Sequence, residues 1–213
     1  MKLKEVWKKF WFIVWKDDSL KGWIFSLIFL FVLIKFIFLP GLGFVTGTSL
    51  PLAIVESCSM YHSHNPLYPF GEWWQDHEEK YEKFTINNLD FKEFSLTNGF
   101  NKGDILFIIK AEPEKIKIGD VIIFNAGQKN PLIHRIIKIE KTNNKYFFST
   151  IGDNNNGQLP VEKKISEEQL VGKAVLKIVP YAGWGKLIAV DIWNKILSQG
   201  NFNYIKEGFC NQN

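Results

Sequence analysis

Three short blocks of this sequence contain the side chains from which a serine hydrolase is built. Ser59 lies in the stretch ESCSM, His134 in LIHRI and Asp153 in GDNN. A serine hydroxyl is a weak nucleophile at neutral pH and needs a neighbouring base. With a reference pKa of about 6.5, a histidine can take that proton and return it to a leaving amine. A carboxylate that orients the histidine completes the set, so we predict Ser59 as nucleophile, His134 as base and Asp153 as the orienting acid.

The order of these blocks, downstream of an apolar run, resembles the signal peptidase I family of serine peptidases. The resemblance is to the branch found in archaea and the endoplasmic reticulum, in which His replaces the Lys of bacterial members. It covers residues from about 22 to 60 and from 103 to 184. It implies that the Ser57 hydroxyl and the Ser59 backbone N–H form the oxyanion hole, where each donor is worth roughly 3–4 kcal/mol. The alternative for Ser57 is an ordinary surface serine.

The sequence departs from this family at two places. Many relatives have a second Asp shortly after the first, where this chain has Leu159. Either Asp153 acts alone, or a carboxylate from elsewhere, such as Glu162, assists it. A further alternative is that GDNN serves only as a turn, for which it is well suited. The second departure is Tyr61-His62, where the family commonly has Pro.

The sequence offers two alternatives to this triad, a Ser–Lys dyad and a metal site. Lys110 ends an apolar run and is an alternative base in a Ser–Lys dyad, but its position fits a Lys that is not the base in bacterial relatives. His62, His64 and His77 with Asp76 form the best alternative metal site, yet their spacing matches no known zinc motif. We therefore expect no metal and no cofactor.

Composition excludes some functions. Of 26 basic residues, 25 are Lys and only Arg135 is Arg, which argues against nucleic-acid binding. Hydrophobic residues make up 46% of the chain, so a packed core is expected. Cys58 lies inside the nucleophile block, and a buried free thiol is expected there rather than a bridge to Cys210.

The segment 22–39 is apolar and long enough, at about 27 Å, to cross a bilayer as a retained anchor. Lys35 lies near its distal end, where its stem can reach the interface, and Pro40 and Gly41 are expected to end the helix. A cleaved signal peptide and a buried core helix are the alternatives. Residues 1–21 contain six Lys, whereas residues 40–60 contain neither Lys nor Arg.

This asymmetry predicts a cytosolic N-terminus, with everything after Pro40 outside the cytosol. The Trp- and Lys-rich tail 6–15 is too short to span and is expected to lie along the inner interface. Anchoring is its expected role, with a contribution to substrate choice as the alternative.

The outer domain is predicted to be mainly β, with an antiparallel signal-peptidase-like sheet. Turn residues bound six β-branched or aromatic runs, at 52–57, 104–110, 120–125, 132–139, 145–151 and 171–179. Asn143-Asn144 between two of these runs predicts a hairpin turn. No helices alternate with the strands, which favours antiparallel pairing.

Residues 61–102 interrupt this pattern and predict a partly helical insertion. One helical face contains aromatic and His side chains, namely Trp73, Trp74, His77, Tyr81 and Phe84. The face could cap the site, touch lipid, or simply pack against the β domain. Residues 186–198 predict an amphipathic helix and no second span.

The expected organisation is a cytosolic tail (1–21), a transmembrane helix (22–39), an extracytoplasmic peptidase domain (40–184) and a C-terminal amphipathic segment (185–213). The resemblance implies a membrane-bound endopeptidase of the cell membrane that removes signal peptides after small residues. Its partners would be preprotein signal peptides, the lipid bilayer and, as an option, the secretion channel. The alternatives are a tethered serine protease with pilin-like or self substrates, and a non-catalytic binding module. Ile54, Val55 and the 120–124 strand are the candidate pocket walls.

Overall fold

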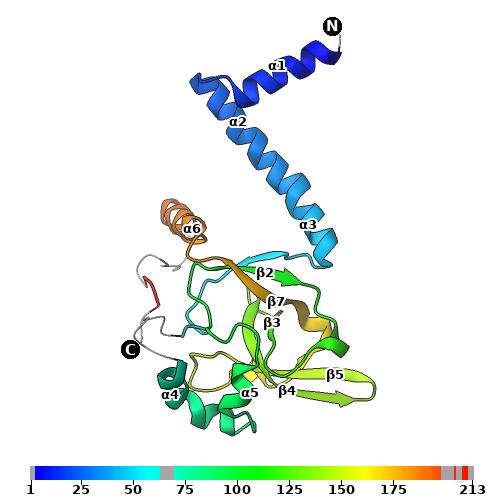
Figure 1. The fold of residues 1–213 in the computed structure, drawn as a ribbon, viewed down its shortest axis with the longest axis vertical. Helices are drawn as coiled ribbons and strands as arrows, with labels where there is room; N and C mark the ends of the chain where they lie inside the picture. Colours follow the sequence, from blue (N-terminus) through cyan, green and yellow to red (C-terminus); the bar gives the residue numbers. More distant parts are fainter. Residues whose placement is uncertain (1–2, 63–69, 198–203, 205–207, 211–213) are drawn as a thin grey trace. The chain divides into compact units, whose positions relative to one another are not determined.

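The computed structural model describes residues 3–62, 70–197, 204 and 208–210. The chain divides into two compact units, Met1–Ser49 and Leu50–Asn213. The first unit is helical and the second is built on a seven-stranded sheet (Figure 1).

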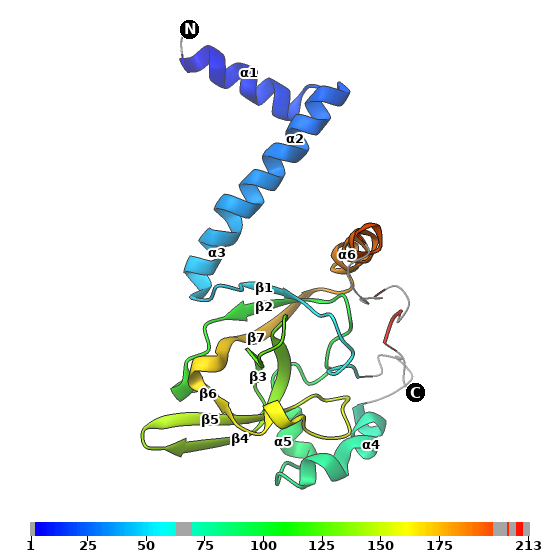
Figure 2. The ribbon, with the colours of Figure 1, turned by 180° about the vertical axis from the view of Figure 1, so that it is seen from behind.

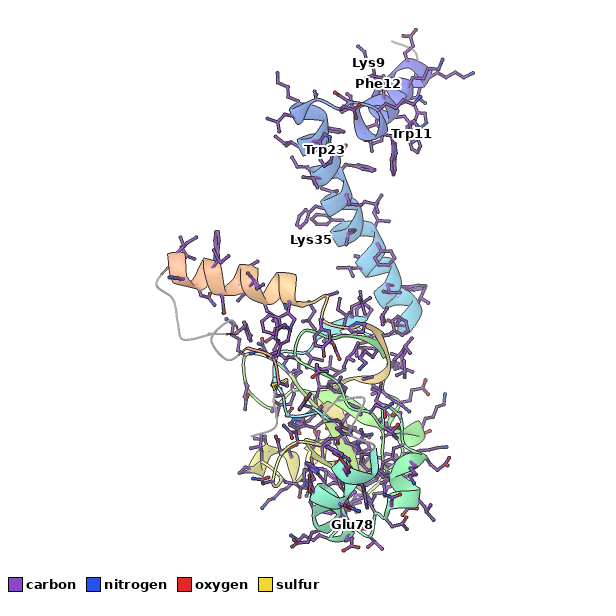
Figure 3. All side chains as sticks on the ribbon, turned by 60° about the vertical axis from the view of Figure 1, so that its left-hand side comes forward. Lys9, Trp11, Phe12, Trp23, Lys35 and Glu78 are labelled. Carbon is purple, nitrogen blue, oxygen red and sulfur yellow. A yellow bond between two sulfur atoms is a disulfide. The ribbon has the colours of Figure 1, made fainter. Side chains whose placement is uncertain are left out.

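The first unit contains one helix long and apolar enough to cross a membrane. Its 27 residues, Leu20–Thr46, comprise α2 (Leu20–Leu33), a π-helical turn and α3 (Leu39–Thr46). Ser19 begins it as the N-cap, with its hydroxyl accepting the Gly22 N–H at 3.1 Å. The preceding α1 (Leu3–Trp15) is also helical, and the Ser26 hydroxyl donates to the carbonyl of Val14. Side chains of Trp11, Phe12, Trp23 and Lys35 project from these helices (Figure 3), as lipid or headgroup contact requires.

The helix continues past Pro40, so the expectation that Pro40 and Gly41 end it is wrong. A proline inside an α-helix has no N–H to donate, and its ring collides with a carbonyl of the preceding turn. Here the π-helical turn Ile34–Phe38 comes just before it, and the Leu39 N–H bonds to the carbonyl of Ile34, five residues back. The wider turn makes room for the ring, which allows the helix to run on to Thr46.

The second unit confirms the predicted antiparallel β fold. All strand pairs are antiparallel, in the order β1-β2-β7-β3-β4-β5-β6, which leaves β1 at one edge. The strands are β1 (Leu52–Ile54), β2 (Ile105–Ile109), β3 (Val121–Phe124), β4 (Leu132–Thr142), β5 (Lys145–Ile151), β6 (Ile165–Ser166) and β7 (Leu170–Val179).

The β4–β5 hairpin carries His134 and Arg135. Asn143 and Asn144 form its turn with φ of 50° and 61°, a conformation that Asn tolerates better than most residues. Residues in β4 alternate between the two faces of the sheet, so His134 and Arg135 point to opposite sides.

The insertion forms part of the core. Its helices are α4 (Phe70–Glu82) and α5 (Asn88–Lys92), seen in green at the lower end of the β unit (Figures 1 and 2). Trp73 and Trp74 are 3% and 2% exposed and pack with side chains of α5, β4 and β5, including Phe91, Ile137 and Ile151. Of the three roles considered, the structure therefore favours packing for these aromatic side chains. His64 lies outside the described residues.

The C-terminal part contributes a helix and a disulfide. The amphipathic helix predicted at 186–198 is present as α6 (Trp184–Ile196). Cys58 and Cys210 are joined by a disulfide across 152 residues of chain. The expectation of a buried free thiol is wrong, because the C-terminal segment returns to the nucleophile block: Tyr204 also donates to Glu56 there.

Candidate active site

Ser59 and His134 come together although 75 residues separate them. Ser59 lies in a turn that follows edge strand β1, closed by a hydrogen bond from the Tyr61 N–H to the carbonyl of Cys58. His134 is held in β4 opposite Ile122 and is only 3% exposed. Ser59 Oγ is 2.8 Å from His134 Nε2, which is the geometry a nucleophile and its base require.

The carboxylate that contacts His134 belongs to Glu162. Glu162 Oε1 lies against His134 Nδ1 and is fully buried. Glu162 sits in a 3-10 turn, Pro160–Glu162, and the turn aims its side chain back at β4 and β5. The backbone N–H of Leu159 donates to Oε2 at 2.6 Å, and the hydroxyl of Thr150 lies 3.3 Å from Oε1. These contacts leave the carboxylate one orientation, toward the imidazole.

The glutamate determines which nitrogen of His134 carries the proton. An ionised carboxylate can only accept hydrogen bonds, so Nδ1 must be the donor to Glu162. In the neutral imidazole, Nε2 then has a free lone pair directed at the hydroxyl of Ser59. That tautomer is the one in which His134 can accept the proton of the Ser59 hydroxyl.

Asp153, expected to orient His134, instead binds Arg135. The guanidinium donates from Nε to both carboxylate oxygens, at 2.9 and 3.2 Å, and from Nη2 at 2.6 Å. Tyr81 and His62 complete the shell of Asp153, each at 2.8 Å. His134 and Arg135 project to opposite faces of β4, so the Asp153 carboxylate that binds Arg135 cannot also reach His134.

Asp153, Arg135 and the insertion form a buried charged cluster. Burial alone would raise the pKa of Asp153, but the charge of Arg135 and the hydrogen bond from His62 hold it far below its usual range. Burial lowers the pKa of His62, which favours the neutral ring stacked on Trp73. Burial likewise lowers the pKa of Lys80 to about 8. The expectation that Arg135 has a structural role is consistent with its complete burial.

Ser57 is exposed, and its hydroxyl lies 3.1 Å from Ser59 Oγ. If the Ser59 proton points at His134, the Ser57 hydroxyl is the donor in this pair. The strand predicted over 52–57 ends at Ile54, and the chain bends after it. The hydroxyls of Ser57 and Ser59 nevertheless lie within hydrogen-bond distance. A hydroxyl beside the nucleophile is placed to donate to an oxygen that develops charge there.

The remaining candidates are placed elsewhere. Lys110 is exposed at the end of β2. His77 bonds to the carbonyl of Trp73, and the described residues include no cluster of three or more His, Cys, Asp or Glu fit to hold a metal ion. Of the candidate walls, β3 is buried along its whole length and belongs to the core, whereas Ile54 at the edge is only half-buried.

Two residues that contact the site, Glu162 and Asn154, were not predicted from the sequence as its main residues. Glu162 entered only as an alternative, and no sequence signal separated it from other glutamates. Asn154 contacts the nucleophile segment directly, and its place in GDNN was the one available sign.

Comparison with known proteins identifies homologues. No protein-family model matches the chain. The signal peptidase complex catalytic subunit SEC11C of Homo sapiens is 34% identical over 108 residues, 46% of this chain and 54% of that protein. The signal peptidase complex catalytic subunit SEC11 of Lachancea thermotolerans is 32% identical over 118 residues, 50% of this chain and 66% of that protein.

These homologues confirm the resemblance to signal peptidases. Both are eukaryotic, so they support the endoplasmic-reticulum side of the expected branch, and the archaeal side stays a prediction. The chain spans about half the length of the SEC11C proteins that it matches.

Proposed function

We propose that this chain is a membrane-anchored serine endopeptidase that removes N-terminal signal peptides from precursor proteins. The observation that carries the proposal is the contact of Ser59 Oγ with His134 Nε2, with Glu162 behind the imidazole. The homology to signal peptidase catalytic subunits supports the substrate class. The apolar helix Leu20–Thr46 supports the anchor, and the Lys-rich residues before it favour a cytosolic N-terminus.

In the proposed mechanism, His134 takes the Ser59 proton as Oγ attacks the scissile carbonyl. Glu162 stabilises the imidazolium that results. The Ser59 N–H and the Ser57 hydroxyl donate to the oxyanion. His134 then gives its proton to the leaving amine, and a water molecule activated by the same imidazole hydrolyses the acyl-enzyme.

The edge position of β1 supports a way to bind substrate. A strand at the edge of a sheet has unpaired backbone groups, to which an extended peptide can add. β1 leads into the turn of Ser59, so a peptide along this edge would reach the nucleophile. Half-buried Ile54 is then a candidate wall of a shallow pocket that rejects large side chains.

Cleavage of a precursor in detergent tests the proposal. The full chain should cut a precursor after an Ala-x-Ala sequence, and a bulky residue directly before the cut should abolish cleavage. Ser59→Ala and His134→Ala should each remove nearly all activity, because residues that act as a unit fail together. Lys110→Ala, a matched surface control, should retain it.

Other outcomes point to the alternatives. If Lys110→Ala is inactive while His134→Ala cleaves, the enzyme uses a Ser–Lys dyad. Cleavage of membrane proteins without the small-residue rule would indicate a protease with other substrates. No reaction of the wild type would leave only a binding role.

A further inference from the structure

The loop Gly152–Asn155 lies directly against the nucleophile turn. The backbone N–H of Asn154 donates to the carbonyl of Ser59 at 2.8 Å. Its side-chain Nδ2 donates to the carbonyl of Cys58 at 3.1 Å. One residue therefore holds the two carbonyls that flank the backbone N–H of Ser59.

The geometry of a trans peptide links these contacts to the oxyanion. The carbonyl of Cys58 and the N–H of Ser59 belong to the same planar peptide and point in opposite directions. A hydrogen bond that fixes the Cys58 carbonyl toward Asn154 therefore aims the Ser59 N–H away from this loop. That N–H is the backbone donor of the oxyanion hole in the proposed function, on which this inference rests.

We propose that Asn154 is a positioning residue whose side-chain amide sets the plane of the Cys58–Ser59 peptide and so aims the oxyanion-hole N–H. It does not touch substrate. If the amide is removed, the Tyr61 N–H still bonds to the Cys58 carbonyl and keeps the turn closed. That carbonyl then has one of these two donors left, so the peptide plane is held less tightly.

The loop is rigid enough to serve as this support. Asp153 is fixed by Arg135, and the Lys80 ammonium donates to the backbone carbonyls of Asp153 and Asn155. At Gly152 a Cβ atom would lie 2.8 Å from the Ser59 carbonyl oxygen, so the close approach requires glycine. The insertion thereby supports the nucleophile through α4, Lys80 and this loop.

The contact differs from ordinary turn chemistry. An Asn that only stabilises its own turn bonds to backbone groups nearby in the sequence. Asn154 instead bonds across 96 residues to the peptide beside the nucleophile. Asn155 is the matched control, because it lies in the same loop but packs its amide against Gly152.

The test compares Asn154→Ala, Asn154→Asp and Asn155→Ala in the full chain, with wild type and Ser59→Ala as references. With an Ala-x-Ala precursor peptide, Asn154→Ala should lower kcat about 10- to 100-fold with KM changed less than about twofold, because one oxyanion donor is misaimed. Asn154→Asp should lose at least as much, because its carboxylate faces a carbonyl. Asn155→Ala should keep kcat, and the melting temperatures should remain close to that of wild type.

A second readout is independent of peptide specificity. A fluorophosphonate reacts with Ser59 as the Oγ–P bond forms and the P–F bond breaks, His134 takes the proton and fluoride leaves. The phosphoryl oxygen occupies the oxyanion position, so Asn154→Ala should slow labelling by the same factor as kcat.

The two readouts distinguish failure of this inference from failure of the proposed function. A wild type that is labelled at Ser59 but does not cleave the precursor would contradict the substrate class alone, and the labelling rates would still decide the role of Asn154. Equal losses in Asn154→Ala and Asn155→Ala, a loss confined to KM, or unchanged labelling would overturn the positioning role. A wild type that neither cleaves nor labels would overturn both.

Discussion

The carboxylate of Glu162 lies against Nδ1 of His134, 28 residues earlier in the chain, with both side chains almost completely buried. On the opposite face of β4, Asp153 binds Arg135. The two acidic residues thus bind different partners, and mutation should separate their effects.

Glu162→Gln should lower kcat by about 10³- to 10⁴-fold with little change in melting temperature, since the amide can favour the wrong tautomer of His134. Asp153→Asn should instead lower the free energy of unfolding by about 3–5 kcal/mol, because it leaves Arg135 buried without its charged partner. Peptide kinetics and denaturant unfolding measure the two effects. A folded, inactive Asp153→Asn beside an active Glu162→Gln would show that Asp153 is the catalytic acid after all.

Trp73→Ala should destabilise the protein by about 3–5 kcal/mol, since it empties a buried site between α5 and the sheet. Leu89→Ala is the control, because Leu89 is 73% exposed and its loss should cost less than about 0.5 kcal/mol. Below the melting transition, Trp73→Ala should affect membrane-embedded precursors and short soluble peptides equally. A selective loss on the embedded precursor would mean that the insertion contacts lipid.

Cys210→Ser should lower the free energy of unfolding by about 2–5 kcal/mol, because the disulfide to Cys58 closes a loop of 152 residues in the unfolded chain. Reductant should lower the melting temperature of wild type and leave Cys210→Ser unchanged. Alkylation of the denatured, unreduced wild type should modify neither cysteine. Modification of both would contradict the bridge.

The stability contributed by Lys80 should depend on pH. Its pKa is about 8 in the folded state, against about 10.4 for an unfolded lysine. Between these values the unfolded chain binds a proton that the folded protein does not, so stability rises with pH. The neutral amine keeps two N–H groups for the carbonyls of Asp153 and Asn155.

The measurement is the free energy of unfolding of wild type minus that of Lys80→Met, from pH 7 to pH 10.5. This difference should be smallest below pH 8 and should increase up to about pH 10. A flat or falling difference would mean that the ammonium is not penalised by burial.

Much of the fold followed from local pattern. The β-branched or aromatic runs, the Asn143-Asn144 pair and the apolar segment before Pro40 are local signals. Periodicity and turn chemistry therefore predicted six of the seven strands, the hairpin and an apolar helix long enough to cross a membrane, but not the two-residue strand β6. The predicted end of that helix at Pro40 was wrong, because a π-helical turn can accommodate a proline. Such a turn has no recognisable signature in the amino-acid composition.

By itself, the sequence predicted the residue types of the site: a serine after an apolar segment in the chain, a histidine as its expected base and acidic residues downstream. Only the tertiary structure decided which carboxylate contacts His134. The alternation of side chains in β4 places Arg135 on the face opposite His134 and so assigns Asp153 to the core. The return of the chain at Pro160–Glu162 delivers Glu162 to the imidazole, and the return of the C-terminal segment pairs Cys210 with Cys58. These are contacts between distant segments, which depend on how the whole unit packs and therefore have no local sequence signature.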